Sequence, residues 1–223
     1  MTDGDYDDYA GYPPLLWSYT ESNVAMRSLF ASAGVARRLL SAGAVELFAE
    51  AGYRFQYIYQ EALDYSGWQL TWNETTSEWE VYLVSYPDTA LTYRVFYHLA
   101  SLGGLARIGI APRLEIGAQA AFLAVLASDK DDHVLRTKLS TAVGAGIGYL
   151  AGLSVRYRFH DRGGSPYLDL SAELLGARVR TTQTQEWYAD TAGEPPPGTV
   201  YTGIPHIITS TQGRITLQLG RHF

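Results

Sequence analysis

Apolar and polar residues alternate along long stretches of this chain. Between residues 105 and 126, the apolar members of the alternation are Ile108, Ile110, Leu114, Ile116, Phe122 and Leu126. The polar members, on the other face, are Arg107, Arg113, Glu115 and Gln119. A period of two predicts β-strands whose two faces meet different surroundings. The runs exceed the ~5–6 residues of an ordinary soluble strand, and they suit membrane-spanning strands of ~9–11 residues with extensions beyond the bilayer.

The connections between these runs alternate in length. The alternation predicts strands over residues 23–40, 45–63, 92–100, 105–127, 134–160, 166–185 and 206–223. Short turns are expected near 41–44, 101–104 and 161–166, and polar loops at 1–22, 64–92, 128–136 and 186–205. Short turns on one side and longer loops on the other are typical of outer-membrane barrels. The predicted fold is an all-β, transmembrane antiparallel β-barrel; a soluble β-sandwich, with shorter strands and more frequent turns, is the alternative.

The strand count predicts a barrel with strands missing at its N-terminus. Bacterial single-chain barrels have an even number of strands, whereas seven are predicted here. The strand at 23–40 would also keep an unpaired edge, which lipid does not tolerate. The chain also begins without the basic and apolar regions of a signal peptide. We therefore expect residues 1–223 to be one N-terminally incomplete barrel domain, whose terminal Phe223 resembles the insertion signal of outer-membrane barrels.

Composition agrees with a barrel that has one face in lipid and one in water. Charged residues make up 18% of the chain and aromatic residues 13%, with Tyr 17 and Gly 22 prominent. The formal net charge of -6 argues against a nucleic-acid partner. The absence of cysteine excludes disulfides and thiolate metal sites.

Two acidic segments carry the candidate chemistry. Asp131 and His133 stand at i and i+2, so on an extended segment they point the same way. A carboxylate beside an imidazole fixes its tautomer and stabilises the imidazolium. Asp3 and Asp5 form a second pair with the same spacing, and like charges at close range raise one carboxyl pKa. The strand count puts both loops at one rim, where a water between the pairs would be placed to attack a peptide carbonyl.

Each of these features has a plainer explanation. Acidic runs at an N-terminus are usually solvated tails, and a loop histidine is more often a surface residue than a base. A metal site built from Asp129, Asp131, Asp132 and His133 is a third possibility, although the segment lacks the glycine turn and terminal glutamate of a calcium loop. We therefore expect no bound metal. The remaining histidines that we considered, His98, His160 and His206, have no carboxylate two residues away.

Three segments resemble the omptin family of outer-membrane proteases. Residues 1–6, Met-Thr-Asp-Gly-Asp-Tyr, are similar to the family's Met-x-Asp-x-Asp-Trp. Residues 17–22, Trp-Ser-Tyr-Thr-Glu-Ser, resemble its Trp-Thr-Asp-Glu-Ser with one insertion. Residues 128–133, Ser-Asp-Lys-Asp-Asp-His, resemble its Ser-Asp-x-Asp-x-His.

The resemblance implies a ten-stranded barrel of which about seven strands are present. It implies an aspartic-type endopeptidase in the bacterial outer membrane, with its site facing outside and cutting polypeptides next to basic residues. Asp131 and His133 would be the catalytic dyad, Asp3 and Asp5 the couple that holds the water, and Asp129 a substrate-binding residue.

The resemblance also implies lipopolysaccharide as an activator and no other cofactor. The family's lipopolysaccharide-binding row, Tyr-x-Glu-x-Arg, reads Tyr53-Arg54-Phe55-Gln56-Tyr57 in this chain. The aromatic residues of this row are also typical of an interfacial belt. The alternatives to a protease are a non-enzymatic outer-membrane barrel, such as an adhesin or structural protein, and an inactive truncated omptin.

Overall fold

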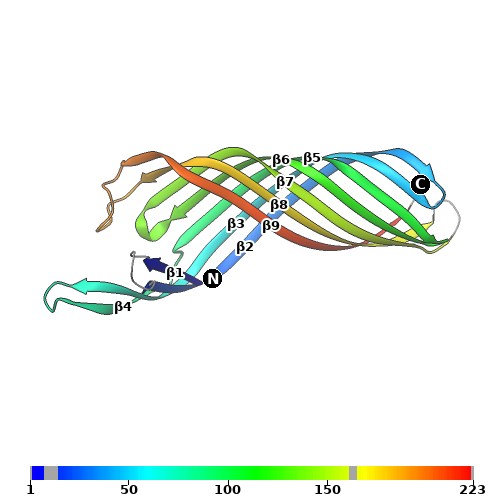
Figure 1. The fold of residues 1–223 in the computed structure, drawn as a ribbon. Coiled ribbons are helices and arrows are strands. Elements are labelled where there is room, and N and C mark those ends of the chain that lie inside the picture. Colours follow the sequence, from blue (N-terminus) through cyan, green and yellow to red (C-terminus); the bar gives the residue numbers. More distant parts are fainter. Residues whose placement is uncertain (1, 8–14, 161–164, 222–223) are drawn as a thin grey trace.

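The protein is a single antiparallel β-sheet that wraps into an elongated barrel-like shape (Figure 1). The computed structural model describes residues 2–7, 15–160 and 165–221. Its elements are β1 (Thr2–Asp7), β2 (Leu15–Ala42), β3 (Val45–Asn73), β4 (Glu78–Tyr86), β5 (Leu91–Ala111), β6 (Leu114–His133), the 3-10 turn η1 (Val134–Arg136), β7 (Lys138–Arg158), β8 (Pro166–Trp187) and β9 (Val200–Arg221). The strands pair in the order β1-β2-β3-β5-β6-β7-β8-β9, and β4 pairs with β3.

The all-β barrel prediction is confirmed. Six of the seven predicted strands each fall on one long strand, whereas the predicted strand 105–127 covers the end of β5 and most of β6. One predicted turn was wrong: residues 101–104 lie inside β5, and the chain turns instead at Pro112 and Arg113. Gly103 marks a close approach of strands, because a Cβ there would collide with the backbone oxygen of Ala120. The faces were still predicted correctly, since Ile108 pairs directly with Ile116 across the true turn.

The polar loops were predicted too long. Residues 1–22 contain β1 and the start of β2, and residues 64–92 contain the end of β3 and all of β4. β6 continues to His133 through the expected loop 128–136, and the 186–205 loop is shortened by both β8 and β9. The polar composition of these segments does not end the hydrogen-bonded ladder.

The two faces of the sheet have opposite chemistry. The outer face is apolar and exposed, as Leu153, Ile215 and Leu219 show. The inner face carries ion pairs, including Arg54 with Glu173 at 2.6 Å and Arg156 with Asp169 at 2.8 Å. None of the helices in the part of the chain that the structure describes is long and apolar enough to cross a membrane.

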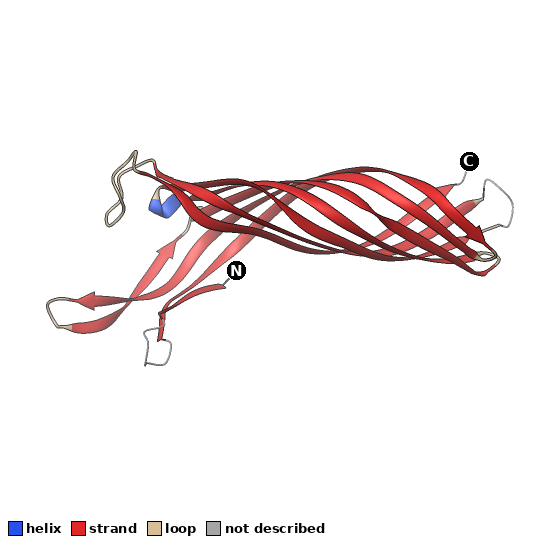
Figure 2. Ribbon diagram, turned by 45° about the horizontal axis from the view of Figure 1, so that its top comes forward, coloured by secondary structure: helices blue, strands red, loops and turns tan. Residues whose placement is uncertain are grey.

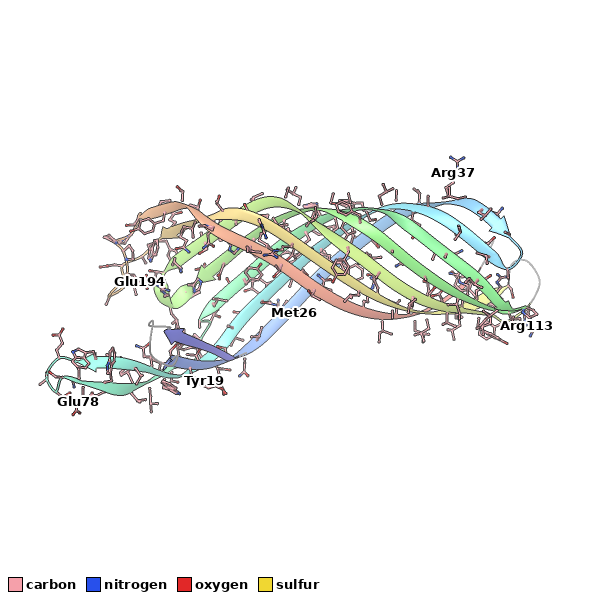
Figure 3. The ribbon with its side chains drawn as sticks, viewed as in Figure 1. Tyr19, Met26, Arg37, Glu78, Arg113 and Glu194 are labelled. Carbon is pink, nitrogen blue, oxygen red and sulfur yellow. The ribbon has the colours of Figure 1, made fainter. Side chains whose placement is uncertain are left out.

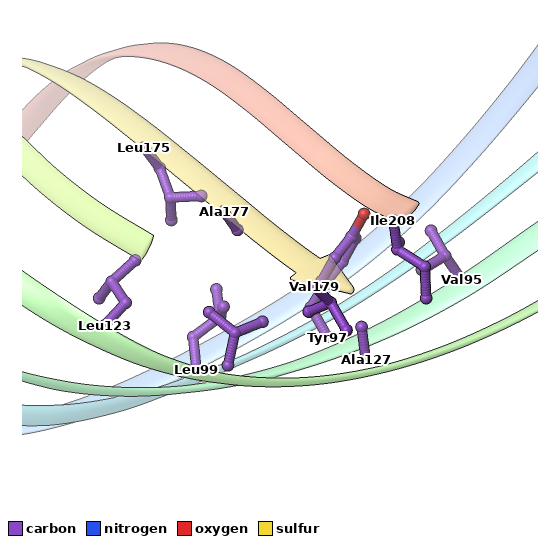
Figure 4. Close-up of a cluster of buried hydrophobic side chains, with 10 residues drawn as sticks. Val95, Tyr97, Leu99, Leu123, Ala127, Leu175, Ala177, Val179 and Ile208 are labelled. Carbon is purple, nitrogen blue, oxygen red and sulfur yellow. The ribbon is translucent and has the colours of Figure 1, made fainter. Parts of the chain in front are cut away.

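An apolar layer fills the interior between the inner ion pairs and one end of the sheet (Figure 4). Its buried members are Val95, Tyr97, Leu99, Leu123, Val125, Ala127, Leu175, Ala177, Val179 and Ile208, from β5, β6, β8 and β9. Along the inner face of β6, Leu123, Val125 and Ala127 lead directly to Asp129. The layer therefore forms a floor beneath the acidic segment of β6.

The connections gather at the two ends as the alternation predicted. The β3–β4 hairpin, β1, η1 and the 188–199 loop lie at one end, and η1 marks it in Figure 2. Glu78 and Glu194 are labelled at this end in Figure 3, whereas Arg37 and Arg113 lie at the other. We call the first end the loop end.

Candidate active site

The candidate dyad lies on the last residues of β6, at the loop end. Because β6 stays extended to His133, alternate residues share one face, and Asp129, Asp131 and His133 continue the inner face of the barrel. The Nε2 atom of His133 lies 3.0 Å from Oδ2 of Asp131. Both side chains keep about a third of their surface exposed, 30% and 29%. This pair is placed to be reached by water and by a polypeptide.

Only one of the two carboxylate oxygens of Asp131 contacts His133. Its Oδ1 atom is buried and accepts no hydrogen bond from the residues that the structure describes. A buried acceptor without a donor costs about 1–3 kcal/mol. Asp131 therefore contacts His133 through Oδ2, while Oδ1 lies buried without a donor among the described residues.

Asp129 is held by two residues that the sequence did not connect with it. Nε2 of His206 lies 2.8 Å from Oδ2 of Asp129, and the Tyr93 hydroxyl donates to the same oxygen at 3.3 Å. The Asp129 side chain is only 4% exposed. His206 comes from β9, 77 residues away, so no local spacing could reveal this contact. Its alternation with Gln212 and Arg214 on the inner face of β9 was the available signal.

The turn after His133 is fixed by the 188–199 loop. η1 joins β6 to β7, and Thr137 adopts a left-handed conformation with φ 48°. The Thr137 hydroxyl donates to the backbone oxygen of Ala189 at 2.8 Å, and the Tyr188 amide donates to the Thr137 oxygen at 2.9 Å. These bonds fix the hairpin that presents the dyad.

The side chain of Glu194 also links the 188–199 loop to η1. Arg136 Nε donates to its Oε1 at 2.6 Å, and Trp187 Nε1 donates to its Oε2 at 2.8 Å. Two hydrogen bonds lower the pKa of Glu194: the bond from Arg136 has the larger effect and the bond from Trp187 the smaller one. Nearby, desolvation and a 2.9 Å hydrogen bond to Asp132 raise the pKa of Tyr188 to about 12. Glu194 is thus ionised in this contact, and Tyr188 is a neutral donor.

The second acidic pair is described only as backbone. Asp3 and Asp5 belong to β1, where they pair with Thr20 and Ser18 of β2. Their side chains lie outside what the structure describes, as does Phe223. β1 sits at the loop end, the end that also holds His133 (Figure 1). Among the described residues, no group of three or more acidic or histidine side chains is arranged to hold a metal ion.

Fold and site together define the class of this protein as an antiparallel barrel of the outer-membrane type, with an acidic and histidine-bearing interior at one end. Its fold is similar to that of a solved outer membrane protease. The crystal structure of the outer membrane protease OmpT from Escherichia coli superposes with a TM-score of 0.74 at 14% sequence identity, covering 100% of this chain and 73% of that chain. The sequence matches no protein-family model and no curated protein.

Proposed function

We propose that this chain is an outer-membrane endopeptidase of the omptin type that hydrolyses peptide bonds next to basic residues. The observation that carries the proposal is the 3.0 Å contact between His133 and Asp131 on the inner face at the loop end. The OmpT-like fold supports it, because OmpT is an outer membrane protease. The apolar outer face supports placement in the outer membrane, and we propose that the loop end faces outside.

The proposed reaction uses the side chains of two segments. His133 takes a proton from a water molecule, while Asp131 orients the imidazole and stabilises the imidazolium that forms. The water oxygen bonds to the peptide carbonyl carbon, and His133 then returns the proton to the leaving amine as the C–N bond breaks. Asp3 and Asp5 are proposed to hold the water from the opposite side. The charge of Asp129 is proposed to favour a basic side chain beside the scissile bond.

The partners follow from the same proposal. They are polypeptides with exposed basic residues, together with outer-membrane lipid. We propose lipopolysaccharide as an activator and no metal or nucleotide cofactor.

The test is cleavage of an Arg-containing fluorogenic peptide by the full chain refolded in detergent, with and without lipopolysaccharide. We expect the His133→Ala variant to lose about 100-fold or more in rate, the contribution of a positioned base. His160→Ala is the matched control, because His160 lies beyond β7 at the opposite end and should leave the rate unchanged. Cleavage that persists in His133→Ala would contradict the assignment of His133 as the catalytic base. No cleavage by the unmodified chain would favour a non-enzymatic barrel.

A further inference from the structure

The carboxylate of Asp129 is covered by another residue, His206. Its side chain is almost fully buried, and Oδ2 is shared by the Tyr93 hydroxyl and by Nε2 of His206. The His206 side chain is 27% exposed, against 4% for Asp129. A ligand that approaches Asp129 from the site therefore meets the imidazole first.

The surroundings leave His206 as the residue that decides the charge of this pair. Inward-facing positions of β8 near His206 are neutral: Thr181, which pairs with it, and Gln183 and Gln185. On the neighbouring strands, Tyr93 and Tyr97 of β5 interact electrostatically with Asp129. Asp131 and His133 follow Asp129 on the inner face of β6, and Lys138 of β7 interacts with Asp131. Of these, Asp131 already pairs with His133.

We propose that His206 sets the charge preference of the site. When His206 is protonated, the Asp129–His206 pair is neutral and a basic substrate side chain gains little from it. When His206 is neutral, its Nε2–H still donates to Asp129, and the pair carries one negative charge that attracts an arginine or lysine side chain. The inference rests on the proposed endopeptidase function.

The coupling must work in both directions. A cation bound beside the pair disfavours the protonated form of His206 by the same factor as protonation disfavours the cation. Loss of the proton from His206 should therefore raise the preference for a basic substrate. The Asp129 side chain is only 4% exposed, and this low contact with water strengthens the interaction.

The test is the ratio of kcat/KM for two peptides that differ only in arginine against citrulline, its neutral counterpart. The ratio cancels effects of pH on the chemical step that the two peptides share. We expect the ratio to rise about tenfold between about pH 5.5 and 8. In His206→Gln the ratio should stay constant within about twofold, as expected when the titrating group is removed. His98→Gln is the matched control, because His98 lies on the outer face of β5, and it should keep the rise.

Asp129→Asn is the second variant, for which we expect a low ratio at every pH. A flat ratio in the unmodified protein, or a rise that persists in His206→Gln, overturns the inference. If neither peptide is cleaved at any pH, the proposed function fails. The same ratio is then taken from dissociation constants of the two peptides measured by calorimetry, and its dependence on pH and on His206 decides the inference alone.

Discussion

Replacing Glu173 by glutamine should destabilise the barrel strongly. Glu173 accepts two hydrogen bonds from Arg54, at 2.6 and 2.9 Å, and Arg214 lies 3.4 Å from the same carboxylate. The Arg54 and Glu173 side chains are only 15% and 10% exposed. Glu173→Gln keeps the shape but leaves two arginines with no negative partner between them. Breaking a buried pair costs about 3–5 kcal/mol, and the partial exposure places our expectation at the lower end, about 3 kcal/mol.

The assay is urea unfolding of the refolded barrel in detergent micelles, followed by tryptophan fluorescence. A double-mutant cycle with Arg54→Met separates the pair from general damage, because the double variant removes both members. We expect the two substitutions to be non-additive by about 1–3 kcal/mol, the range for residues in direct contact. A Glu173→Gln variant within about 1 kcal/mol of the unmodified protein, or simple additivity of the two changes, would refute the reasoning.

Two further predictions concern the apolar floor and the loop contact. Leu123→Ala should lower the unfolding free energy by about 2–5 kcal/mol, because Leu123 is 1% exposed and its removal leaves a cavity; in the same assay Leu126→Ala, on the outer face, should cost less because detergent fills the space. Glu194→Gln should reduce amide-exchange protection of residues 188–199 about threefold, the size expected for a partly exposed ion pair. Because the pKa of Glu194 is lowered, its contribution is present above about 4.3, the ordinary value, and is lost as the pH falls through the lowered value. Protection corrected for intrinsic exchange should therefore fall in acid in the unmodified protein but not in Glu194→Gln.

The strands were predictable because apolar residues recur at every second position on the outer face over long stretches. Alternation over 105–126 assigned the faces correctly, because the two-residue turn at Pro112 and Arg113 preserved the assignment even though the turn itself was misplaced. The boundaries failed where composition was a poor guide. Residues 101–104 suggested a turn but lie inside β5, where Gly103 marks a close approach of strands. The polar segment 128–133 suggested a loop but continues the ladder.

The candidate site was predictable only where its residues are neighbours in sequence. The i, i+2 spacing predicted that Asp131 and His133 point the same way, and they are in contact. The contact of Asp129 with His206 depends on the curvature that brings β9 towards β6, strands that are not hydrogen-bonded to each other. Strand alternation predicts the face on which a residue lies but not its partner across the barrel interior. The contact between Asp129 and His206 is therefore visible only in the folded structure.

The two Asp–His pairs lie at different depths above the apolar floor, and the tasks proposed for their histidines differ accordingly. Asp129 follows Ala127 on the inner face of β6, directly above buried apolar side chains, and an unpaired carboxylate there would be costly. Its coverage by His206 and Tyr93 satisfies the charge but also keeps water from the carboxylate. Asp131 and His133, one and two steps nearer the rim, keep more contact with solvent. General-base chemistry needs a water at the imidazole, which favours His133, whereas charge selection needs a fixed carboxylate in a region of low polarity, which favours the Asp129–His206 pair.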